Sequence, residues 1–115
     1  MSELCGHGLE PRIHDRLEEV VPESDALYVT RVQLERIPQD QRPATIPYIV
    51  TPATMAMAKP RGEMILMHPL PRDSQDGNPE ISVEVDADPR AAYFRQCEYG
   101  MYARMAILSR MLRAD

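Results

Sequence analysis

The chain has 115 residues, enough for one domain with a modest core, and its 43% hydrophobic and 27% charged residues are typical of soluble globular proteins. Its net charge of -5 argues against a protein that binds the nucleic-acid backbone, because such a protein needs a basic surface. Every apolar run is shorter than the roughly 20 residues of a membrane span, and the N-terminal residues lack the pattern of a signal peptide. We therefore expect a cytoplasmic protein that binds neither nucleic acid nor membrane.

The cysteines and histidines near the N-terminus are the candidates for metal binding. Cys5 and Cys97 lie far apart in the sequence, which suggests no disulfide framework. His7 and His14 could join them as ligands, but the spacing matches no paired pattern such as two Cys-x-x-Cys hooks. The sequence therefore predicts reduced thiols and no metal site.

The first predicted elements form a strand–helix–strand unit. Residues 10–14 read as a short strand, and residues 15–21 as a short helix with Asp15 as N-cap and Glu18 in the capping-box position. Residues 26–30 are the next predicted strand. Elements in this order predict parallel pairing of the two strands with a right-handed crossover.

The middle of the chain predicts a loop, a helix and a third strand. Residues 37–47 are rich in Pro, Gln and Arg, which is typical of a surface loop. Thr51 is predicted as the N-cap and Pro52 as the first-turn residue of a helix through residues 53–58. Residues 64–67 form a short apolar run that predicts a buried strand.

A long helix is predicted at the end of the chain. Residues 81–85 alternate between apolar and polar side chains and lead to Asp88 and Pro89, which we expect to cap and start a helix running to about Leu112. Apolar side chains recur there every three or four positions, as on the buried stripe of an amphipathic helix. The members of this stripe are Phe94, Cys97, Met101, Met105, Leu108 and Leu112.

Polar residues directly follow the predicted strand over 26–30. Arg31 can present a planar, permanently charged guanidinium to a carboxylate, and Gln33 offers the same ligand a donor and an acceptor. Glu35 is placed to orient the guanidinium, and Arg36 could pair with a carboxylate across a cleft. The alternative is a solvated, salt-bridged helix start that binds no ligand.

A proline turn, defined here as residues 68–72, follows the predicted third strand. Its two prolines fix the backbone just past the strand's C-terminal end, where open α/β sheets bind ligands. We expect a cis bond between Leu70 and Pro71, which would turn the carbonyls of Pro69 and Leu70 towards a cleft; the alternative is a rigid loop without a ligand. His68 is predicted to be structural, because no carboxylate lies near it in the sequence.

Several ordered motifs resemble the C-terminal part of aspartate carbamoyltransferases, and the animal multifunctional pyrimidine enzymes most of all. The matching segments are residues 25–36, 68–72, 80–96 and 100–106. The resemblance implies a three-layer α/β domain with a parallel sheet, of which this chain supplies about three strands and the flanking helices. Residues 1–115 would be the C-terminal portion of the aspartate-binding domain, with the N-terminal carbamoyl-phosphate domain absent.

The resemblance also implies substrate-binding residues, carried over position by position. Arg31 and Gln33 would bind L-aspartate, and Pro69, Leu70 and Pro71 would line the carbamoyl phosphate site. No catalytic residue is expected within this chain, and no cofactor. Supporting roles fall to Glu35, which would orient Arg31, to Arg36, which would pair with the other domain, and to Arg104, which would support the site from the last helix.

The reaction implied is transfer of the carbamoyl group of carbamoyl phosphate to L-aspartate in de novo pyrimidine biosynthesis. The family's phosphate-binding Ser-x-Arg-Thr-Arg motif belongs to the N-terminal domain and is not found in this sequence. We therefore expect the chain alone to be inactive and to need that missing domain, in a full enzyme that is a homotrimer. The alternatives are a non-catalytic remnant that acts as an interaction module, and a module that binds dicarboxylates without a second substrate.

Overall fold

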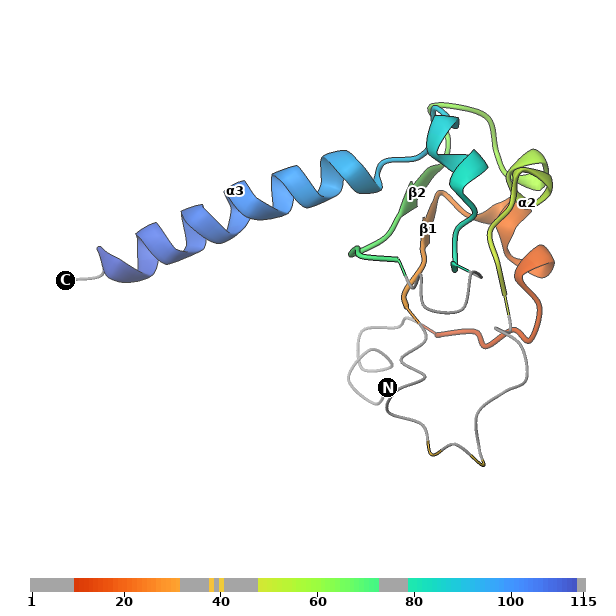
Figure 1. The fold of residues 1–115 in the computed structure, drawn as a ribbon, viewed down its shortest axis with the longest axis horizontal. Helices are drawn as coiled ribbons and strands as arrows, with labels where there is room; N and C mark the ends of the chain where they lie inside the picture. The colour runs from red at the N-terminus through yellow and green to blue at the C-terminus, as the bar shows by residue number, and fades with distance from the viewer. Residues whose placement is uncertain (1–9, 32–37, 39, 41–47, 73–78, 114–115) are drawn as a thin grey trace.

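A pair of parallel strands forms the sheet of this computed structural model, and short helices flank it (Figure 1). Strand β1 (Ala26–Tyr28) pairs with β2 (Ile65–Met67), so that Leu27 lies opposite Leu66. This arrangement confirms the predicted α/β class with a parallel sheet and an incomplete set of strands. The structure describes residues 10–31, 38, 40, 48–72 and 79–113.

The predicted first strand and first helix are both wrong. Residues 10–14 form no strand and are exposed to solvent. The predicted helix over 15–21 is instead a pair of 3₁₀ turns, η1 (Leu17–Glu19) and η2 (Val21–Glu23), and the N-cap of η1 is Arg16 without a side-chain cap. Pro22 lies inside η2 and has no N–H to donate, which prevents one continuous α-helix.

Helix α2 (Pro52–Met57) begins as predicted from its sequence. The Thr51 hydroxyl accepts a hydrogen bond from the Thr54 N–H at 3.2 Å, and the Thr54 hydroxyl receives the Thr51 N–H at 3.3 Å. These two reciprocal bonds form a capping box, which satisfies backbone donors that the first turn of a helix otherwise leaves unpaired.

The segment before the last helix takes a different form from the one expected. Ile81 forms an isolated parallel bridge with Val50, and the chain then enters a 3₁₀ helix, η5 (Val83–Ala87). Asp88 does not cap the last helix, because its carboxylate binds the backbone and side chain of Arg90. Helix α3 (Tyr93–Leu112) consequently begins four residues after Pro89.

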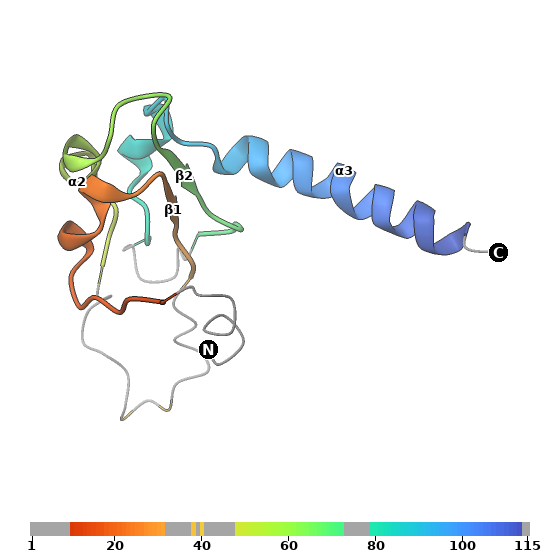
Figure 2. The ribbon, with the colours of Figure 1, turned by 180° about the vertical axis from the view of Figure 1, so that it is seen from behind.

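Helix α3 extends away from the rest of the molecule (Figures 1 and 2). Its first turn lies against β2, and among its described residues only Tyr93 is buried. The prediction that these apolar side chains form a buried stripe is therefore wrong. Met105 and Leu108 are each 59% exposed, because no described part of the chain covers them. No helix among the described residues has the length and apolar character needed to cross a membrane.

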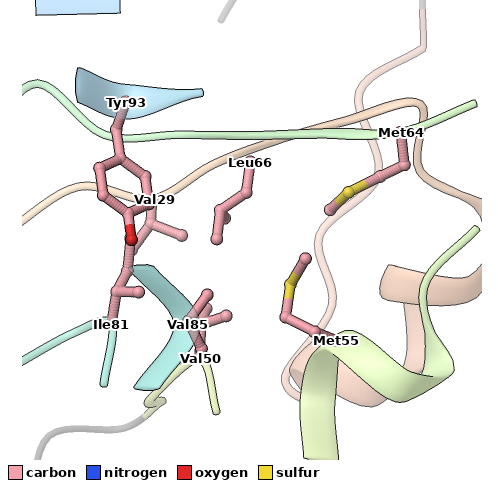
Figure 3. Packing of buried hydrophobic residues seen from close by; sticks show 8 residues of the cluster. All are labelled: Val29, Val50, Met55, Met64, Leu66, Ile81, Val85 and Tyr93. Atoms are coloured by element: carbon pink, nitrogen blue, oxygen red, sulfur yellow. The ribbon is translucent and has the colours of Figure 1, made fainter. Parts of the chain in front are cut away.

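The core lies between the sheet, α2, η5 and the start of α3 (Figure 3). Apolar side chains from each of these elements meet there and are almost completely shielded from water. The cluster comprises Val29, Val50, Met55, Met64, Leu66, Ile81, Val85 and Tyr93. It holds the C-terminal ends of both strands in fixed positions, which is where the candidate site lies.

Candidate functional site

The carboxyl ends of β1 and β2 lie side by side. The Val29 N–H donates to the carbonyl of Met67 at 2.9 Å, directly after β1 and at the last residue of β2. Arg31 follows on one strand and is partly buried, while the proline turn follows on the other. Ligands of open α/β sheets bind at such strand ends, so the structure brings two predicted segments to one edge. Gln33, Glu35 and Arg36 lie outside the described residues.

The proline turn has the predicted backbone. The Leu70–Pro71 peptide bond is cis, which confirms that prediction. Leu70 has φ of 49°, in the left-handed region that residues with a side chain seldom adopt. Pro69 and Pro71 are exposed, and Leu70 is partly buried against the core. The turn therefore presents its two prolines to solvent and anchors itself through the leucine between them.

The buried His68 side chain lies beneath this turn. Its Nδ1 accepts a hydrogen bond from the Leu70 N–H at 2.9 Å, and its Nε2 lies 3.9 Å from a carboxylate oxygen of Glu80. Both side chains are fully shielded from water. Burial lowers the pKa of His68, and Arg72 lowers it further, while Glu80 acts in the opposite direction. Sequence reasoning missed Glu80, because residues 73–78 separate it from the turn.

The far end of the turn is held by a charged cluster of Arg72, Asp86 and Tyr93. Two Arg72 nitrogens donate to the two Asp86 carboxylate oxygens, each at 2.8 Å, and the Tyr93 hydroxyl donates to the same carboxylate. The hydrogen bonds from Arg72 lower the pKa of Asp86, and burial raises the pKa of Tyr93 well above its ordinary value. No local sequence signal pointed to this cluster, since it joins three separate segments.

Gln96, in the first turns of α3, connects both strand ends. Its amide oxygen accepts from the His68 N–H at 3.0 Å, and its amide nitrogen donates to the Tyr28 hydroxyl at 3.1 Å. Sequence reasoning missed this residue because it lies on a helix far from either strand in the chain. It fixes the position of α3 relative to the proline turn.

An open hollow of about 210 Å³ lies between the proline turn and α3. The predicted residues Pro69 and Arg104 both line it. Its remaining lining residues are Tyr28, Gln96, Cys97 and Gly100. A guanidinium near the turn can attract an anionic group, while backbone carbonyls can accept hydrogen bonds from an amide.

Metal binding has no candidate site in the part of the chain that the structure describes. No group of three or more His, Cys, Asp or Glu side chains gathers there. Cys5 and His7 lie outside these residues, so the absence of a metal site stays a prediction.

The comparisons with known proteins agree with one another. The family model described as aspartate/ornithine carbamoyltransferase, Asp/Orn binding domain, matches residues 2–111. The multifunctional protein CAD of Squalus acanthias is 46% identical over 111 residues, covering 95% of this chain and 5% of that protein. The aspartate carbamoyltransferase catalytic subunit of Clostridium botulinum is 47% identical over 100 residues, covering 85% of this chain and 30% of the subunit. The chain thus spans less than a third of either relative.

Solved structures give the same result for the fold. Aspartate transcarbamoylase from Trypanosoma cruzi, in complex with aspartate and phosphate, superposes with a TM-score of 0.68 and 47% sequence identity. The alignment covers 93% of this chain and 30% of that one. This chain, with the two-stranded parallel unit described above, therefore corresponds to part of a longer chain in this solved structure.

Proposed function

Because this chain belongs to the aspartate/ornithine carbamoyltransferase family, as its motifs indicated, we propose that it is part of an aspartate carbamoyltransferase. Residues 1–115 would form the C-terminal portion of the aspartate-binding domain. The observation that carries this proposal is the proline turn at the carboxyl end of β2, beside the hollow that Arg104 lines. The reaction would transfer the carbamoyl group of carbamoyl phosphate to L-aspartate in de novo pyrimidine biosynthesis.

We assign the substrate-binding residues to the segments that follow the two strands. Arg31 and Gln33, which follow β1 in the chain, would bind the carboxylates of aspartate through charge-assisted and amide hydrogen bonds. Pro69, Leu70 and Pro71 would line the carbamoyl phosphate site, with the carbonyls of Pro69 and Leu70 accepting from the carbamoyl NH₂ group. Both substrates would then meet at the edge where the Val29 N–H binds the Met67 carbonyl.

The chemistry needs placement and charge stabilisation rather than a cofactor. The aspartate amine attacks the carbamoyl carbon and forms the new C–N bond, the bond from that carbon to the phosphate oxygen breaks, and the departing phosphate takes up the proton that the amine loses. Holding the two substrates in contact lowers the barrier by removing translational freedom, and fixed cations stabilise the developing charge. The supporting residues in this scheme are Glu35, Arg36 and Arg104.

The missing partner would be the N-terminal carbamoyl-phosphate domain of the same enzyme. Helix α3 supports this choice, because its apolar side chains are exposed and the chain spans only 30% of a catalytic subunit. We propose that this face packs against the N-terminal domain, and that the full enzyme is a homotrimer. The cytoplasmic location stays a prediction.

Substitution of Arg31 in the full-length enzyme tests the assignment of the aspartate site. If Arg31 holds a substrate carboxylate, Arg31→Ala leaves that carboxylate unpaired in a desolvated site. Such a loss costs about 2–5 kcal/mol, which corresponds to a drop of roughly thirty-fold to several-thousand-fold in kcat/KM for aspartate. Arg31→Lys should recover only part of it, since an ammonium cannot reproduce the planar fork. Steady-state kinetics with aspartate varied at saturating carbamoyl phosphate measure the effect.

The exposed Arg61 supplies the matched control, because Arg61→Ala removes the same charge before β2, at the opposite end of that strand from the proline turn. This control variant should keep kcat/KM for aspartate within about twofold of that of the unsubstituted enzyme, because exposed surface charges contribute little. Near-normal aspartate kinetics in Arg31→Ala would contradict the aspartate site. A full-length protein without any carbamoyl transfer would instead favour the non-catalytic remnant.

A further inference from the structure

The hydrogen bond from the Leu70 N–H to the His68 ring has no role in the function proposed above. The donor and acceptor lie 2.9 Å apart, and the His68 side chain is fully buried. Leu70 itself is partly buried. An N–H group that is shielded from water and loses its partner is costly, so the bond favours one orientation of the backbone at Leu70.

The surroundings of the ring keep Nδ1 available as an acceptor. Because Nδ1 receives the Leu70 N–H, the ring proton of a neutral imidazole must be on Nε2, the nitrogen that faces Glu80 at 3.9 Å. That separation is longer than a hydrogen bond, yet a buried carboxylate still favours a proton on the nitrogen nearest to it. Burial lowers the pKa of His68, which keeps the ring neutral near pH 7.

The bond holds a backbone conformation that leucine does not readily adopt by itself. Leu70 has φ of 49°, where the Cβ of an L-residue crowds the backbone. A side-chain acceptor that binds the N–H two residues later has the connectivity of an Asx turn, the arrangement that Asn and Asp side chains form. The His68 ring thus accepts the same hydrogen bond in this turn that an asparagine side chain could accept.

We propose that His68 is a positioning residue for carbamoyl phosphate, which orients the carbonyls of Pro69 and Leu70 by holding the Leu70 N–H through Nδ1. This inference rests on the proposed function, since it names the residue that shapes the carbamoyl phosphate subsite. His68 does not touch the substrate in this scheme. Its removal should therefore weaken the use of carbamoyl phosphate while leaving that of aspartate nearly unchanged.

Two variants of the full-length enzyme with nearly the same shape test the proposal. His68→Asn keeps an acceptor for the Leu70 N–H, whereas His68→Leu fills a similar volume without one. We expect His68→Leu to raise the KM for carbamoyl phosphate about tenfold, the effect of losing one hydrogen bond. His68→Asn should stay within about threefold of the unsubstituted enzyme, and the KM for aspartate should change less than about threefold in both. Equal effects of the two substitutions would overturn the proposal.

The tautomer of the ring provides a second measurement that does not depend on how the variants fold. Two-bond ¹H–¹⁵N NMR of the unsubstituted protein should show a neutral His68 with its proton on Nε2; a proton on Nδ1 would overturn the proposal. The kinetic experiment also separates this inference from the proposed function. An unsubstituted enzyme without carbamoyl transfer would overturn both, whereas an active enzyme with indistinguishable variants would overturn the role of His68 alone.

Discussion

At the scale of single residues, the proline turn is held at its far end by an ion pair with little contact with water. Arg72 and Asp86 form two parallel hydrogen bonds of 2.8 Å, and their side chains are 18% and 27% exposed. A bidentate pair of this kind is stronger than an exposed surface pair, because both partners are fixed in geometry and partly desolvated. The Arg72 guanidinium also lies 5.7 Å from the centre of the Tyr93 ring, which adds a cation–π contact.

Asp86→Asn should destabilise the chain and change its response to acid. The hydrogen bonds from Arg72 lower the pKa of Asp86 below its ordinary value of 3.8. A carboxyl group with a lowered pKa stabilises the folded state above pH 3.8, and this contribution is lost as the pH falls through the native pKa. At pH 7 we expect a loss of about 1.5–3 kcal/mol, the range for hydrogen bonds to charged groups.

Urea unfolding followed by circular dichroism, at pH 7 and in steps below pH 4, measures both effects. The variant should lose less further stability below pH 3.8 than the unsubstituted chain does. Asp15→Asn serves as the control, because Asp15 is exposed and should shift the midpoint little. Parallel acid profiles for Asp86→Asn and the unsubstituted chain would contradict the stabilising role of this pair.

At the scale of secondary structure, α2 shows how far a local signal determines an element. Thr51, Pro52 and Thr54 lie within four consecutive residues, and each acts at the start of the helix. Thr51 supplies the cap, Pro52 has no N–H that needs a partner, and Thr54 completes the capping box. All the interactions that start α2 are therefore readable from four consecutive residues.

Thr51→Ala should destabilise α2 by removing its cap. Loss of a threonine cap costs about 1 kcal/mol, within a range of roughly 0.5–2 kcal/mol. Amide hydrogen exchange over residues 52–58 should then become about fivefold faster, which corresponds to 1 kcal/mol of local stability. Thr51→Ser keeps the hydroxyl and should stay close to the unsubstituted rate; equal acceleration in both variants would count against the capping box.

Sequence reasoning was wrong or incomplete where a side-chain pair overrode a local signal or joined distant parts of the chain. Asp88 carries the sequence signal of a helix cap, but Arg90, two residues later, binds its carboxylate and also reaches the carbonyl of Lys59. The periodicity of apolar residues predicted a helix where α3 lies, because this spacing is a local property of the sequence. It could not predict that the apolar side chains of α3 stay exposed. The pairing of His68 with Glu80 was missed for the same reason. Burial and long-range pairing depend on the whole fold.

At the scale of the whole molecule, the described part of the chain combines a closed core with an open helix. Val50, Leu66 and Ile81 are fully buried, whereas Leu112 at the end of α3 is 85% exposed. The core therefore fixes the strand ends without any contribution from the outer turns of α3. An exposed apolar helix surface usually marks a site where another protein or domain binds.

The isolated chain should show no carbamoyl transfer and should bind an apolar dye. Adding the separately expressed N-terminal portion of the enzyme should restore turnover and lower the dye fluorescence, because that portion would cover α3. Leu108→Glu should weaken this reconstitution, whereas Ser109→Glu, about 100° further around the helix, should affect it less. Formation of carbamoyl-aspartate by the isolated chain at a rate saturable in aspartate would contradict the need for a second domain.

The methionines of the core and those of α3 differ in chemical reactivity. Met55 and Met64 lie in the core with 1% and 2% of their surface exposed. By contrast, the three methionines of α3 are open to solvent, at positions 101, 105 and 111. Peroxide converts accessible thioethers to polar sulfoxides, so α3 would be modified before the core. Oxidation would thus alter the face that we propose for domain contact before it reaches the core, and a covered α3 would keep its thioethers reduced.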